Sequence, residues 1–211
     1  MSLSLNELES LSKRAVRGGG YPWGLAEEAG KAARWLCIHG LDAVGELAAL
    51  LDKSLVKPAA DYRPVCSDVS LVWRSHERLC PLATGAHLSD NAKKFMSREC
   101  ELRNIVHPTL LLPFVANVAY INDQTYTVEC NDSVATVNSN SVDLNHPFTA
   151  YAEIVYIKAG GFMSKVGTRQ HRAYVNEACL LELKRFAELT YAPATEKSRL
   201  LGAGTVLSDN D

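Results

Sequence analysis

Apolar residues recur at helical spacing through the first quarter of the chain. Ser4 and Glu7 fit a helix capping box, and an apolar stripe follows at Leu5, Leu8, Leu11 and Ala15. A second stripe starts after Pro22 and stops at Gly40, and a third runs from Val44 to Leu51. The pattern therefore predicts three amphipathic helices before Lys57 and no strand in the first fifty residues.

The period changes in the second half of the chain. Leu110, Leu112 and Phe114 recur at the two-residue spacing of a strand, as do Tyr126, Val128 and Cys130, and Asn122-Asp123-Gln124 supplies turn chemistry between the two runs. These two runs predict an antiparallel hairpin. Residues 148–157 are apolar on both faces and are closed by Gly160-Gly161, which predicts a long central strand.

A last amphipathic helix is predicted from about Arg172 to Thr190, with its apolar stripe from Val175 to Ala187. Helices, then strands, then a helix indicate an α+β fold. We expect N-terminal amphipathic helices, a mainly antiparallel sheet built from residues 110–157, and the C-terminal helix packed on that sheet. The expected organisation is one domain over residues 1–211, with a helical subregion at 1–57 and the sheet, last helix and tail at 61–211. Residues 61–101 show no clear pattern.

Composition narrows the class of protein without naming a function. The chain has 211 residues, 47% of them hydrophobic, and a formal net charge of −2, which argues against a nucleic-acid partner. No stretch reaches the roughly 20 apolar residues of a membrane span, and the first twenty residues lack a secretory signal pattern. We expect a cytoplasmic protein with no membrane partner.

The six cysteines are scattered singly, so we expect free thiols. Cys66, His76, Cys80 and His87 are residue types that bind zinc, but their spacing does not match structural zinc sites, and no metal is expected. Gly18-Gly19-Gly20 precedes a helix, as phosphate-binding loops do. Because a helix and not a strand comes before it, an inter-helix turn is favoured over a nucleotide loop.

The C-terminal end has an unusual composition. The stretch from Thr190 to Arg199 and the following Gly202-Ala203-Gly204-Thr205 combine hydroxyls, an arginine and glycines, which are suited to holding a small anion. Tyr191, Pro193 and several later aliphatic residues predict that residues 192–205 are ordered and dock near the glycine turn. The alternative is a tail that only packs on the surface.

Two segments carry a family resemblance. The opening from Leu5-Asn6-Glu7-Leu8-Glu9 through Gly20-Tyr21-Pro22-Trp23-Gly24, together with the ending through Ser198-Arg199 to Gly202-Ala203-Gly204, resembles an uncharacterised bacterial family, domain of unknown function 3726. The resemblance extends over nearly the whole chain and is firmest at its two ends. It implies a short cytoplasmic bacterial protein without an assigned reaction, so it transfers no catalytic residue and no cofactor.

Two functional hypotheses follow. The first is an enzyme or enzyme accessory that binds a small anionic metabolite where the two ends of the chain meet, through Arg17, Tyr21, Trp23, Ser198 and Arg199. The second is a homo-oligomeric structural or interaction module, assembled through the strands between residues 110 and 157. The sequence identifies neither a catalytic residue nor a cofactor for either hypothesis.

Overall fold

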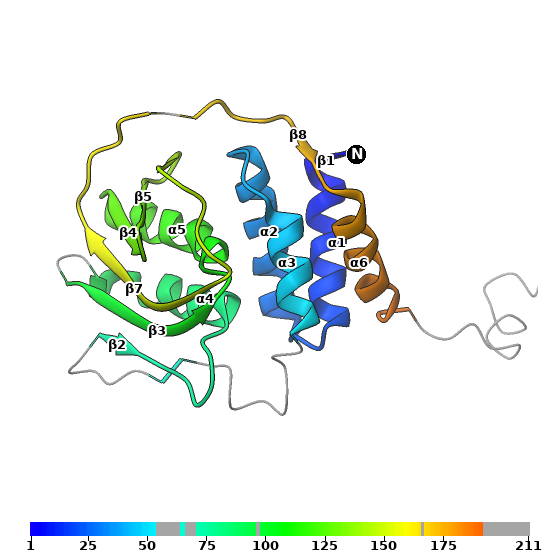
Figure 1. Ribbon diagram of the computed structural model, residues 1–211, viewed down its shortest axis with the longest axis horizontal. Coiled ribbons are helices and arrows are strands. Elements are labelled where there is room, and N and C mark those ends of the chain that lie inside the picture. Colours follow the sequence, from blue (N-terminus) through cyan, green and yellow to red (C-terminus); the bar gives the residue numbers. More distant parts are fainter. Residues whose placement is uncertain (54–63, 66–70, 96–97, 166, 192–211) are drawn as a thin grey trace, which may run out of the picture.

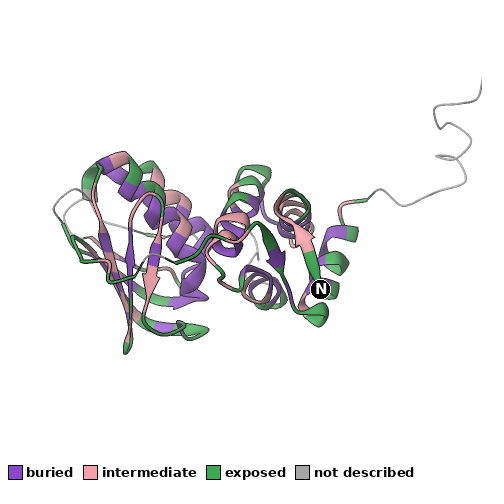
Figure 2. Cartoon of the chain, turned by 90° about the horizontal axis from the view of Figure 1, so that it is seen from above, coloured by how far each residue is buried: buried purple, intermediate pink, exposed green. Residues whose placement is uncertain are grey.

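The computed structural model describes residues 1–53, 64–65, 71–95, 98–165 and 167–191. Its helices and mainly antiparallel sheet confirm the α+β class. The elements form two packed parts: a helical part made from both ends of the chain, and a sheet part made from its middle (Figure 1). Buried side chains of the two parts form one continuous cluster. Figure 2 shows this burial along the chain.

The three predicted N-terminal helices are confirmed. They are α1 (Leu5–Gly18), α2 (Trp23–Ile38) and α3 (Ala43–Asp52). The capping box of α1 is present, since the Glu7 amide donates to the Ser4 hydroxyl at 3.2 Å and the Ser4 amide donates to the Glu7 carboxylate at 2.7 Å. Leu8, Leu11 and Ala15 of the α1 stripe are buried.

The C-terminal helix α6 spans Glu177–Glu188, and its start differs from the prediction because Arg172–Tyr174 is a strand, β8. This strand pairs antiparallel with β1 (Ser2–Ser4), so the prediction of no strand in the first fifty residues was wrong. Three-residue strands are too short to show alternation.

α6 packs against α1 and α3. At Gly18 the two backbones of α1 and α6 meet so closely that an added Cβ would lie 1.8 Å from the Phe186 carbonyl oxygen. Only glycine is compatible with this approach, because any side chain would force the helices apart.

Among the described residues, six strands form the main sheet in the order β2-β3-β7-β4-β5-β6. Their bounds are β2 Val72–Trp73, β3 Cys100–Val106, β4 Tyr126–Cys130, β5 Ser133–Val137, β6 Val142–Leu144 and β7 Tyr151–Ala159. All neighbours are antiparallel except β2 and β3. The predicted long strand, β7, lies between β3 and β4, and its apolar positions face theirs: Val155 opposite Leu102, and Ile157 opposite Val128.

The predicted hairpin between residues 110–114 and 126–130 was wrong. Residues Pro108–Leu111 form the 3-10 helix η2 and Leu112–Asn122 form α5, while the hairpin partner of β4 is β5. A short, nearly continuous apolar run fits a buried helix as well as a strand. Pro113 fits the first turn of a helix, where its missing amide hydrogen costs nothing.

α5 contacts the sheet at β4 and β5, and it packs against the helix α4 (Pro81–Asp90). The 3-10 helix η1 (Ala92–Phe95) follows α4 in the chain.

Candidate functional site

The described residues of the predicted anion site lie at the end of α1 and the start of α2. The Arg17 guanidinium donates to the Tyr21 carbonyl oxygen at 3.0 Å and lies 5.3 Å from the centroid of the Trp23 ring. The side chain of Tyr21 is buried, with its hydroxyl 3.4 Å from the Cys80 sulfur, whereas Trp23 is exposed. Arg17 and Trp23 are thus together at the surface, and Tyr21 belongs to the core.

Ser198 and Arg199 lie outside the described residues, as does the tail predicted to be ordered. The last described residue is Tyr191, whose hydroxyl accepts a hydrogen bond from Arg14, one helical turn before Arg17. The chain therefore leaves the described part near the C-terminal end of α1.

Three described helices of the helical part, α1, α3 and α6, point in the same direction. Their C-termini lie together, because Gly18 meets Phe186 of α6 and Gly19 meets Leu51 of α3. Their N-termini lie together at the opposite pole, where β1 and β8 pair directly before α1 and α6 begin. Helix N-termini carry partial positive charge and C-termini partial negative charge. Three helix N-termini therefore favour an anion at the pole where α1, α3 and α6 begin, whereas at the glycine turn three helix C-termini lie beside the N-terminus of α2.

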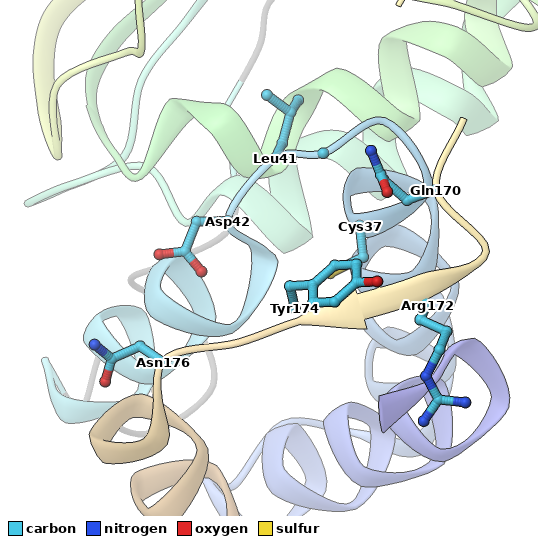
Figure 3. A pocket seen from close by; sticks show the side chains of 8 residues that line it. Cys37, Leu41, Asp42, Gln170, Arg172, Tyr174 and Asn176 are labelled. Atoms are coloured by element: carbon cyan, nitrogen blue, oxygen red, sulfur yellow. The ribbon is translucent and has the colours of Figure 1, made fainter. Parts of the chain in front are cut away.

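An open pocket of about 550 Å³ lies at this N-terminal pole (Figure 3). We call it the Arg172 pocket. It is formed by the turn between α2 and α3, by strand β8 and by the start of α6, and its lining residues are Cys37, Gly40, Leu41, Asp42, Gln170, Arg172, Tyr174 and Asn176.

Two residues of the pocket are helix caps. The Asp42 carboxylate accepts from the Gly45 amide at 2.8 Å at the start of α3. The Asn176 side-chain oxygen accepts from the amides of Ala178 and Cys179 at the start of α6. Both side chains are held by their own helices, so the pocket walls are fixed relative to the two N-termini.

Arg172 is the only cationic side chain among the described lining residues. Its Nε donates to the Ser2 hydroxyl at 3.3 Å, so this nitrogen is tied to β1. Its charge also reaches Glu7, whose pKa is lowered chiefly by the hydrogen bond from the Ser4 amide, then by the Ser4 hydroxyl, and to a smaller extent by Arg172. A guanidinium carries five N–H donors, and the hydrogen bond to Ser2 uses one of them.

Cys37 lies on the wall of the pocket with little of its surface exposed. Burial raises the pKa of the Cys37 thiol to about 11. The thiol is therefore protonated near neutral pH and is a poor nucleophile. The pocket's chemistry is that of binding by charge and hydrogen bonds.

A carboxylate–imidazole pair with a buried histidine connects the two parts of the molecule. His107, between β3 and η2, lies with its Nδ1 2.6 Å from a carboxylate oxygen of Glu46 in α3. His107 is 3% exposed, and its Nε2 has no hydrogen-bond partner in the described part of the chain. Its backbone is left-handed, with φ 47° and ψ 53°. Neither residue was singled out in the sequence, where a lone histidine and a helical glutamate carry no signal.

Possible metal ligands and the cysteines were located throughout the described part of the chain. No group of three or more histidine, cysteine, aspartate or glutamate side chains there could hold a metal ion. The five described cysteines, Cys37, Cys80, Cys100, Cys130 and Cys179, are free thiols, and Cys66 lies outside the described residues.

The fold and the pocket define an α+β protein with a small polar pocket beside its helical part. Residues 3–77 match the family described as "Protein of unknown function (DUF3726)", so the family resemblance is confirmed over this part of the chain. No curated protein matches the chain. In the described ranges, no helix is both long and apolar enough to cross a bilayer.

Two solved malate dehydrogenases are similar in structure. The enzyme from Pyrococcus horikoshii OT3 has a TM-score of 0.52 at 14% identity, covering 72% of this chain and 50% of that one. The enzyme from Entamoeba histolytica has a TM-score of 0.48 at 12% identity, covering 76% and 49%. The chain spans about half the length of these enzymes, and at such identities the similarity to the first is one of fold alone.

Proposed function

We propose that the protein binds a small anionic metabolite in the Arg172 pocket, as an enzyme or as an accessory of one. The observation that carries the proposal is that Arg172 lines a metabolite-sized pocket at the pole where α1, α3 and α6 begin. A volume of about 550 Å³ falls in the range of small-molecule sites.

The chemistry of the lining favours a carboxylate or a phosphate group. A guanidinium presents a planar fork that matches the oxygens of either group, and helix N-termini add favourable partial charge. Gln170, Tyr174 and Asn176 add side-chain groups that donate or accept hydrogen bonds. The acids Glu7 and Asp42 lie near the same pole, so a ligand with one acid group suits the pocket better than a polyanion.

The test is a thermal-shift screen with inorganic phosphate and small carboxylates. Malate is included because one protein of similar fold is a malate dehydrogenase. A ligand at about 100 times its Kd stabilises by about 2.7 kcal/mol, which corresponds to roughly 5–10 °C in Tm for a chain of this size. Arg172→Ala should abolish this shift, whereas Arg169→Ala, an exposed arginine three residues earlier, should leave it intact. Equal shifts in both variants would show that the anion binds elsewhere.

The site between the glycine turn and the C-terminal tail is a second candidate for the same function. Its support is that Arg14 holds Tyr191 beside Arg17, so the tail starts close to this turn. Arg17, Tyr21 and Trp23 would then act with Ser198 and Arg199, although Tyr21 could contribute only its backbone. Loss of the ligand shift in Arg199→Ala but not in Arg172→Ala would favour this site.

The homo-oligomeric module is the alternative from a different class. It is favoured by apolar side chains at the sheet surface, where Val134 is 37% and Tyr151 is 43% exposed. Light scattering that shows a concentration-independent dimer, together with no response to any anion, would favour the module over the ligand-binding protein.

A further inference from the structure

A second pocket lies where the helical part of the molecule meets the sheet part. It has a volume of about 410 Å³, and we call it the Trp35 pocket. One wall is formed by α2, and the opposite wall comes from α4 and α5, the two helices of the sheet part that α2 contacts. Among the described lining residues, none is shared with the Arg172 pocket, so the two pockets are separate sites.

Two aromatic rings give the pocket its apolar surface, and neighbouring groups hold both in place. The Trp35 ring lies 4.1 Å from the His39 imidazole, centroid to centroid. The Phe114 ring packs on Gly85, where an added Cβ would lie 2.2 Å from a ring carbon. Because both rings are fixed by their neighbours, this apolar surface is formed before a ligand arrives, which lowers the entropic cost of binding.

One carboxylate and one ammonium group lie at the same pocket. Glu28 and Lys31 are one helical turn apart on α2, and the Lys31 Nζ donates to the Glu28 carboxylate at 2.7 Å. Their side chains are 43% and 64% exposed, so this ion pair contributes little to stability. Both charges can therefore turn to a ligand that carries an ammonium and a carboxylate of its own.

A polar group without a partner lies in the α4 wall of the pocket. The Ser89 hydroxyl is buried and has no hydrogen-bond partner in the described part of the chain. Buried hydroxyls are nearly always hydrogen-bonded, so an unpaired one indicates that a partner is missing. The polar head group of a ligand would supply that partner. Asn117 of α5 is exposed and adds an amide that can donate or accept there.

We propose that the Trp35 pocket binds a free amino acid with an apolar side chain. The ammonium group of the ligand pairs with Glu28, and its carboxylate pairs with Lys31. Its side chain packs against Trp35 and Phe114, where it leaves water. A neutral ligand would use the apolar surface alone, and a simple anion would meet the Glu28 carboxylate. The two charges therefore select a zwitterion.

L-phenylalanine is the probe, and the readout is the indole N–H signal of each tryptophan in nitrogen–proton NMR spectra. Trp23 and Trp35 lie about 18 Å apart along α2, so they serve as matched reporters. The Trp35 signal, assigned with Trp35→Phe, should shift saturably, and the Trp23 signal should not. Phenylpropionate lacks the ammonium group and phenethylamine lacks the carboxylate, so each should bind about tenfold more weakly than L-phenylalanine.

Variants of the two charged residues test the recognition of the head group. Lys31→Met and Glu28→Gln should each raise the Kd of L-phenylalanine about tenfold. Lys184→Met, the same change at an exposed position of α6, should leave this Kd unchanged. Ser89→Ala should also raise the Kd, yet it should not lower the melting temperature, because no hydrogen bond within the described part of the chain is lost.

Three results would refute the proposal. The first is the absence of a saturable shift at Trp35, and the second is equal affinity for L-phenylalanine and phenylpropionate. The third is loss of the Trp35 shift in Arg172→Ala with its retention in Lys31→Met, because the ligand would then be bound by the Arg172 pocket.

Discussion

Leu183→Ala is expected to lower the free energy of unfolding by about 2–5 kcal/mol, because it removes a fully buried side chain and leaves a cavity. Leu183 is 0% exposed, on the face of α6 that packs against α1 and α3. Since α6 closes the helical part of the fold, the loss should affect the whole molecule and not only the C-terminal end. Urea unfolding followed by circular dichroism measures it.

Leu181→Ala is the matched control on the same helix. Leu181 is 58% exposed, and a surface substitution of this kind changes stability by about 0.5 kcal/mol or less. Both variants replace leucine by alanine in the same helix, so intrinsic helix propensity cancels in the comparison. The reverse order of the two unfolding energies would mean that α6 presents the opposite face to the core.

The helices that the sequence predicted well have clear ends and one apolar face. α1 has a capping box and a stripe, and three glycines follow it, so local chemistry and burial agree. α5 is different because it has few polar residues: Phe114, Ala116 and Val118 are all at most 4% exposed, and its exposed positions are Asn117 and Tyr120. One asparagine and one tyrosine are too few to reveal a helical period, and Pro113 is the clearest local sign of a helix start.

The Arg172 pocket could not be predicted from the sequence because distant segments form it. Cys37 to Asp42 and Gln170 to Asn176 are distant in the chain and meet because β8 pairs with β1 and the Gln170 amide donates to the Ile38 carbonyl oxygen at 2.7 Å. Local signals exist at Asp42 and Asn176, which precede apolar stripes as helix caps do. They indicate where α3 and α6 begin, but not that the two N-termini face one pocket.

Glu46→Ala is expected to lower the free energy of unfolding by about 1–3 kcal/mol, the cost of leaving a buried polar group without its partner. The Nε2 of His107 already has no partner in the described part of the chain, so the variant would leave both ring nitrogens unpaired. Glu46→Gln keeps an oxygen that can accept from Nδ1 and should cost distinctly less. Chemical denaturation of both variants gives the comparison.

A double-mutant cycle with His107→Ala isolates the energy of the pair, and residues in such contact typically couple by about 0.5–3 kcal/mol. The pair joins α3 to the turn after β3, so its loss should also loosen the junction between the helical part and the sheet. The His107 amide, which donates to the Ala150 carbonyl oxygen at 2.9 Å, reports on that junction. Hydrogen exchange at this amide should be faster in Glu46→Ala than in Glu46→Gln. A coupling energy near zero, with unchanged exchange, would show that the junction is held by apolar packing and not by the carboxylate–imidazole pair.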